Sequence, residues 1–143
     1  MPSLHHLAFS ATDLAASGKF YDAFLGVLGY GAAHINDGLR TWVGPCPAPE
    51  ILVYAVEGTD RTPHTHGRPG LQHVALKVAD RATVLAVHEA VAGGGWDIIH
   101  PPQEFDYMPG YFATFIADPD GCRWEIAHIP APAGETDIDF DER

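Results

Sequence analysis

The chain contains one short pattern twice, and this repeat constrains its fold more than any other feature. Residues 6–13 read HLAFSATD and residues 73–80 read HVALKVAD. In each copy a histidine opens an alternating run, and an aspartate follows seven residues later, where a helix can begin. The match continues at the same offset as far as Gly26 and Gly93. Such a repeat predicts two similar half-domains, each with a histidine at the equivalent position.

The sequence pattern of each half is typical of a strand followed by a helix and three further strands. A threonine or aspartate can cap each helix, and glycine can end it. The first half is expected to contain a strand over residues 4–10, a helix over 13–28, and strands over 32–35, 40–43 and 51–56. The second is expected to contain a strand over 72–78, a helix over 80–93, a strand over 96–99, a long loop over 101–109, and a hairpin of strands 111–116 and 123–129.

The predicted fold class is therefore α+β, with two βαβββ modules related by a pseudo-twofold axis. Their curved mixed sheets are expected to form a cup. Residues 1–130 would make a single domain, with module 1 at about 4–58, a linker at 59–70 and module 2 at about 71–129. Residues 131–143 form an acidic tail after a stretch rich in proline, alanine and glycine, and this tail is expected to lie outside the core.

Charge and composition exclude several classes of function. The chain has 8 basic and 19 acidic residues, a net charge of −11, which argues against nucleic acid or an anionic membrane surface as a partner. No apolar run approaches the length of a membrane span, and no signal-peptide pattern is expected. Cys46 and Cys122 do not suggest a disulfide framework. A cytoplasmic protein is the simplest interpretation.

Three residues form a candidate metal site in the cup. His6 and His73 open the two repeated strands, so they are expected to point into the cup from equivalent positions. Glu125 alternates with Trp124 and Ile126 in the last strand, which predicts that its carboxylate faces the cup too. Two histidines and one carboxylate suit Fe(II), Mn, Ni or Zn. The simpler alternative is that each is an ordinary solvated or hydrogen-bonded side chain, but the repeat relation favours the ligand role.

Five further side chains are candidates for substrate contact or proton transfer, and each has a structural alternative. Tyr107 and Tyr111 belong to a loop before a cup strand, where a phenol can hydrogen-bond a substrate oxygen or simply pack against the sheet. Tyr54 could hydrogen-bond a metal-bound water. Lys77 could bind an anion at the rim or stay solvated, and Trp42 is either a wall of the pocket or part of the core.

These segments resemble the vicinal oxygen chelate superfamily, which includes glyoxalase I, fosfomycin-resistance and bleomycin-resistance proteins, methylmalonyl-CoA epimerase and extradiol dioxygenases. The matching segments are HHLAFSATDL at residues 5–14, KFY at 19–21, LG at 28–29, QHVAL at 72–76 and FIADPDGCRWE at 115–125. The resemblance covers nearly all of residues 4–129. It implies the paired-module fold, places the superfamily's metal ligands on His6, His73 and Glu125, and suggests a homodimer.

The chain departs from the known branches of this superfamily at several positions. Glyoxalase I and the epimerase supply a fourth ligand from a strand where this chain has Leu52, so lactoylglutathione lyase activity is not expected. Phe115 stands where the dioxygenases and the fosfomycin group place a tyrosine, and would contact the substrate. The dioxygenases' acid–base histidine corresponds to about Asp106. The subfamily is therefore unassigned.

The function expected from the sequence is that of a divalent-metal-dependent enzyme acting on a small oxygenated organic substrate. The metal would stabilise an oxyanion in a lyase- or isomerase-like reaction. Two alternatives remain: an extradiol-type Fe(II) dioxygenase, and a metal-free protein that binds a small molecule such as a drug.

Overall fold

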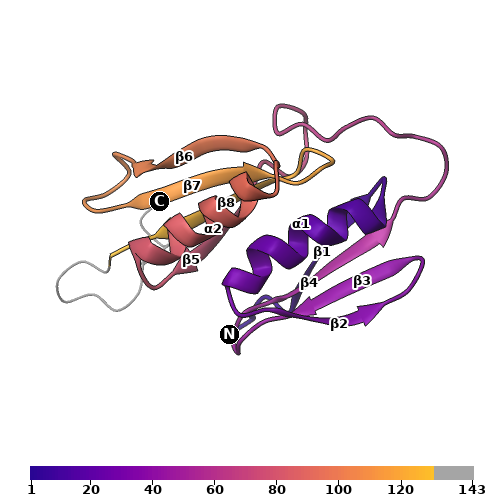
Figure 1. The fold of residues 1–143 in the computed structure, drawn as a ribbon, viewed down its shortest axis with the longest axis horizontal. Coiled ribbons are helices and arrows are strands. Elements are labelled where there is room, and N and C mark those ends of the chain that lie inside the picture. Colours follow the sequence, from indigo (N-terminus) through magenta and orange to yellow (C-terminus); the bar gives the residue numbers. More distant parts are fainter. Residues whose placement is uncertain (131–143) are drawn as a thin grey trace.

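The computed structural model describes residues 1–130, so the predicted acidic tail lies outside the described residues. This part of the chain forms two helices and eight strands (Figure 1). In chain order they are β1 (His6–Ala11), α1 (Leu14–Val27), β2 (Gly31–Ile35), β3 (Leu39–Val43), β4 (Glu50–Ala55), β5 (Val74–Val78), α2 (Arg81–Gly93), β6 (Ile98–Glu104), β7 (Phe112–Ala117) and β8 (Arg123–His128).

The two helices begin at the aspartates of the repeat. The side chain of Asp13 accepts a hydrogen bond of 2.9 Å from the Ala16 amide, and that of Asp80 accepts one of 2.8 Å from the Thr83 amide. Each aspartate thereby satisfies an N–H group that has no partner within the helix. After α1, Gly29 adopts a φ of 84°, a conformation that favours glycine. The helix boundaries predicted from the repeat are confirmed to within about a turn.

The two halves have the same sheet topology. The strand order is β1-β4-β3-β2 in one sheet and β5-β8-β7-β6 in the other. The pairs β1·β4 and β5·β8 are parallel, and the other pairs are antiparallel. The prediction of an α+β fold built from two βαβββ modules is confirmed.

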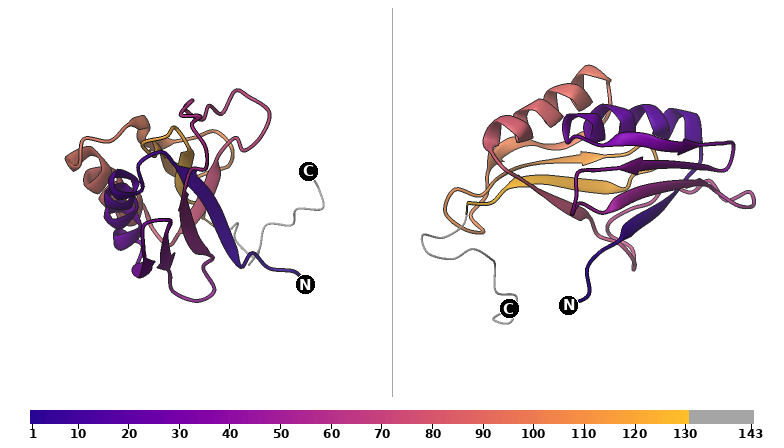
Figure 2. Two further views of the ribbon diagram at one scale, coloured as in Figure 1. Left: turned by 90° about the vertical axis from the view of Figure 1, so that its right-hand side faces the viewer. Right: turned by 90° about the horizontal axis from the view of Figure 1, so that it is seen from below.

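A shared aromatic core joins the modules. Both helices lie on one side of the strands (Figure 2) and pack against each other. The ring of Trp124 in β8 lies 5.1 Å from that of Phe9 in β1 and 5.3 Å from that of Phe24 in α1, between ring centroids. The modules therefore bury their apolar faces against one another in one shared core.

Strand β6 differs from its predicted form. The prolines at 101 and 102 favour a loop, yet β6 runs through them to Glu104. Its pairing with β7 is irregular between His100 and Gln103, and β6 is an edge strand. Proline is tolerated there because it lacks only an N–H that an edge strand need not pair. The predicted loop is consequently shorter and begins after Glu104.

The cap at Asp80 predicts a pH dependence of stability. Hydrogen bonds from the Thr83 amide and hydroxyl hold the pKa of Asp80 below its ordinary value. The stabilisation is therefore present above the carboxyl's unfolded-state pKa and is lost as pH falls through the lower folded-state pKa. Asp80→Asn keeps a capping oxygen but cannot titrate. We expect the difference in unfolding free energy between wild type and Asp80→Asn to shrink between neutral pH and about pH 3 in urea titrations.

Glu89→Gln is the matched control, because Glu89 is an exposed carboxylate on the same helix and caps nothing. Its pH profile should follow that of the wild type more closely. Parallel profiles for wild type and Asp80→Asn over the acid range would contradict the capping account.

Candidate functional site

An imidazole and a carboxylate meet on the face of the second sheet that is turned away from the helices. His73 directly precedes β5, and Glu125 lies in β8, which pairs in parallel with β5. His73 Nε2 and Glu125 Oε2 are 3.1 Å apart. Trp124 and Ile126 point into the shared core, so Glu125 between them points to the opposite face. Its carboxylate is nonetheless buried, with 3% of the residue exposed.

Two neighbours orient this pair. The Tyr111 hydroxyl donates a hydrogen bond to Glu125 Oε1, and the side-chain oxygen of Gln72 contacts His73 Nδ1. If Nδ1–H donates to Gln72, the Nε2 lone pair faces the Glu125 oxygen. Two lone pairs at this distance need a proton or a cation between them. Metal-ligating histidines commonly donate their other N–H to an oxygen in this way, so the donor set fits a divalent ion.

A cavity of about 290 Å³ opens onto the pair. Its lining consists of aromatic rings and a few polar or charged groups. The lining residues are Gln72, His73, His100, Phe105, Tyr107, Phe115, Arg123 and Glu125. Phe105 is stacked on Tyr107, with ring centroids 5.4 Å apart, and its edge meets the ring of Phe115 at 5.5 Å. The segment that follows β6 therefore covers one side of the cavity with rings.

Five of the predicted site residues come together here. Four of them line the cavity: His73, Glu125, Tyr107 and Phe115. The fifth, Tyr111, donates a hydrogen bond to Glu125 at the edge of the cavity. Tyr111 is also largely buried among Ala113, Phe115 and Ala127, so it both packs and hydrogen-bonds.

The structure does not bring His6 to this pair within one chain. The end of β1 lies beside the β7–β8 turn, where Thr12 Oγ1 donates a 2.6 Å hydrogen bond to Asp120. His6 opens β1, about 20 Å away from Thr12 along the extended strand. Within residues 1–130 no group of three His, Cys, Asp or Glu side chains is close enough to hold a metal ion. The three predicted ligands therefore do not meet within this part of one chain; the sequence leaves open whether the cup is completed within the chain or across a dimer.

The reason lies in how the modules meet. The pseudo-twofold pairing was expected to turn both histidine-bearing strands toward a common cup. Instead α1 and α2 pack against each other, and each sheet keeps its own outer face. On module 1 we call this the open face; it carries His6, Ala8, Ser10 and Tyr54, all exposed.

Three other predicted residues lie elsewhere. Trp42 is only 2% exposed and donates a 2.8 Å hydrogen bond to Asp22, so of its two alternatives, a wall of the pocket or part of the core, it belongs to the core. Tyr54 is 42% exposed on the open face. Lys77 is exposed on β5 and does not line the cavity.

Four lining residues were not predicted. Arg123 could have been found, because it stands two residues before Glu125 and therefore shares its face of the strand. Gln72 could have been found as the neighbour of His73. His100 and Phe105 reach the cavity through the irregular part of β6 and the turn after it. The sequence there shows no regular alternation of apolar and polar residues that would predict which side chains face the cavity.

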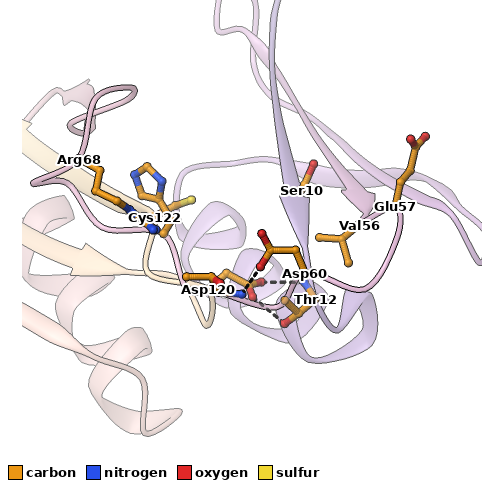
Figure 3. Close-up of a pocket in the computed structure, with 10 residues that line it drawn as sticks. Ser10, Thr12, Val56, Glu57, Asp60, Arg68, Asp120 and Cys122 are labelled. Atoms are coloured by element: carbon orange, nitrogen blue, oxygen red, sulfur yellow. Dashed lines mark hydrogen bonds between the residues drawn. The ribbon is translucent and has the colours of Figure 1, made fainter.

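A second cavity, of about 450 Å³, lies between the end of β1, the linker and the β7–β8 turn (Figure 3). It is lined mostly by polar residues and holds none of the predicted site residues. Cys122 borders it, but burial raises the pKa of this thiol to about 12, so the thiol stays protonated near neutral pH. The larger cavity is thus not the one with the histidine–carboxylate pair.

Comparisons with known proteins agree with this architecture. A relative from Bacillus subtilis (strain 168), the uncharacterized protein YqjT, is 26% identical over 124 residues, 86% of this chain and 96% of the relative. A putative glyoxalase from Bacillus halodurans superposes with a TM-score of 0.76 and 26% identity, covering 88% of this chain and 95% of that one. The fosfomycin resistance protein FosX from Mesorhizobium loti shares the fold, with a TM-score of 0.65, 16% identity, and coverage of 91% and 94%.

Neither helix in residues 1–130 is long and apolar enough to cross a membrane.

The family model for the glyoxalase/bleomycin resistance protein/dioxygenase superfamily matches residues 3–126. The chain belongs to this superfamily, also called the vicinal oxygen chelate superfamily.

Proposed function

We propose that the protein is a divalent-metal-dependent enzyme acting on a small oxygenated organic substrate. The observation that carries the proposal is the 3.1 Å contact between the half-buried imidazole of His73 and the buried carboxylate of Glu125, which opens onto a cavity. A carboxylate that is 3% exposed is costly unless cations or donors surround it. His73, Glu125 and a third ligand would hold the ion, and the ion would supply Lewis-acid polarisation of a substrate oxygen.

The third ligand in this proposal is His6 of a second copy of the chain. His6 lies on the open face of module 1, where strand residues that would face a cup are exposed. A symmetric dimer that sets this face against the cavity of the other protomer would complete two identical sites. Tyr54 lies on the same face, beside Ser10 and not beside His6.

The chain's own residues have separate roles in this site. Tyr111 and Gln72 hold Glu125 and His73 in place. The phenol of Tyr107, at the cavity wall and 65% exposed, is placed to donate a proton to a substrate oxygen. Phe115 and Phe105 exclude water from one side. These roles suit a lyase- or isomerase-like proton transfer.

Two alternatives have support from particular residues. His100 lines the cavity and could act as an acid–base group in an extradiol-type dioxygenase with Fe(II). A metal-free binding protein is favoured by the fact that both Glu125 oxygens already have partners, His73 and Tyr111. The metal content of the protein separates these from the main proposal.

The test is elemental analysis of untagged protein purified without chelator, for wild type and His73→Ala. We expect about one Fe, Mn, Ni or Zn per chain in the wild type and almost none in the variant, because a three-ligand site loses most of its affinity with one ligand gone. Iron would direct assays to ring-cleaving oxygenation, and the other ions to lyase and isomerase reactions.

His66→Ala is the matched control, because His66 belongs to the linker and lines neither cavity described above. It should retain the wild-type metal content. A wild type that holds no metal, and gains no thermal stability when each ion is added, would exclude the metalloenzyme and favour the binding protein.

A further inference from the structure

The cavity beside His73 and Glu125 contains a positive group that makes no ion pair with any residue of the described chain. Arg123 is half-buried and lines the cavity, yet its guanidinium makes no hydrogen bond or ion pair within residues 1–130. Three other arginines have partners: Arg81 pairs with Glu104 at 2.5 Å, and Arg61 and Arg68 donate to backbone carbonyls. A guanidinium without an acceptor at the wall of a cavity is a ready site for an anion.

The position of Arg123 fixes where that anion would lie. Arg123 and Glu125 are two residues apart on one strand, so their side chains leave the same face about 7 Å from each other. Val74 pairs with Trp124, so His73 and Arg123, each one residue earlier, are also neighbours across the two strands. An anionic group on Arg123 would therefore lie near His73, in the same cavity as Glu125.

The other walls of this cavity are mainly aromatic rings. Phe115 lies at the centre, with the ring centroids of His73 at 5.6 Å, His100 at 5.4 Å and Phe105 at 5.5 Å. Aromatic walls favour a planar ring that can stack or meet them edge to face. A cavity of about 290 Å³ has room for one such ring with small substituents.

The charge balance selects the kind of anion. Arg123 is the one Lys or Arg among the residues that line this cavity, and Glu125 contributes a carboxylate to it. In the metal-free protein, a phosphate or phosphonate dianion would be repelled by Glu125, with only Arg123 in the cavity lining to offset its charge. A carboxylate carries one charge, and its two oxygens match the guanidinium fork.

We propose that the site takes a single-ring aromatic monocarboxylate, with the carboxylate on Arg123 and the ring against the aromatic walls. This substrate class rests on the proposed function for the reaction itself, but not for binding. The anion contact is made by Arg123, which is not one of the proposed metal ligands, so it is expected in the metal-free protein as well.

The experiment is isothermal titration of the full chain with 4-hydroxybenzoate and with its neutral counterpart 4-hydroxybenzyl alcohol, before and after metal loading. We expect the acid to bind more tightly than the alcohol. Arg123→Gln should weaken the acid roughly ten- to hundredfold, the usual range for a charged hydrogen bond, and leave the alcohol unchanged. Arg123→Lys should retain part of the affinity because it keeps the charge.

Lys77→Gln is the matched control, because it removes the same charge from an exposed position outside the cavity. Equal binding of acid and alcohol, an unchanged acid affinity in Arg123→Gln, or no binding of the acid in either metal state would overturn the proposal. Acid binding that depends on Arg123 in a protein that never loads metal would instead uphold it and reject the metalloenzyme.

Discussion

Mixing His6→Ala protein with His73→Ala protein is expected to restore metal binding that neither variant shows alone. If His6 comes from a second copy, a mixed dimer has one site with all three ligands and one site that lacks both histidines. Random exchange makes half of the dimers mixed, so about one quarter of the sites should regain metal. Elemental analysis after mixing, partial unfolding and refolding together measures this fraction.

The control is a mixture of His73→Ala with Glu125→Gln. Both residues belong to the same half-site, joined at 3.1 Å within one chain. Every site in a mixed dimer of these two variants therefore lacks one ligand, and metal content should stay low. Restoration in this control, or none in the first mixture while the wild type binds metal, would mean that the site is not shared between two copies.

The sequence predicted those parts of the fold that depend on local chemistry. The repeat gave the module plan, and Asp13 and Asp80 marked the helix starts because a capping carboxylate acts on its own next turn. The alternation around Glu125 also predicted its face correctly, since side chains on a strand alternate regardless of the partner strand. At the cavity Glu125 meets four other predicted site residues: His73, Tyr107, Tyr111 and Phe115.

The rest depended on contacts distant in the chain. A repeat shows that two modules are alike, but not whether they meet through their helices or through their strands. Here the rings of α1 settle that choice, since Phe20 and Phe24 are fully buried and Phe20 packs against Trp96 of module 2. His6 is separated from His73 as a result. Trp42 was undecided because its place beside Asp22 depends on how α1 crosses the sheet.

Trp124→Ala is expected to destabilise the whole of residues 1–130, and not the second module alone. Trp124 is fully buried in β8, yet its ring contacts Phe9, Tyr21 and Phe24, which all belong to module 1. Truncating a buried tryptophan typically costs about 3–5 kcal/mol through lost burial and the cavity left behind. Urea unfolding followed by far-UV circular dichroism and by the fluorescence of the remaining tryptophans measures the loss.

Leu85→Ala provides the comparison, because Leu85 is a large apolar residue on α2 that is 45% exposed. Its truncation should change the unfolding free energy by no more than about 0.5 kcal/mol. In Trp124→Ala the two probes should still report one coincident transition, because the two modules share a single core. Separate transitions, with module 1 retaining wild-type stability, would show that the modules fold independently and that the ring contacts across their interface contribute little.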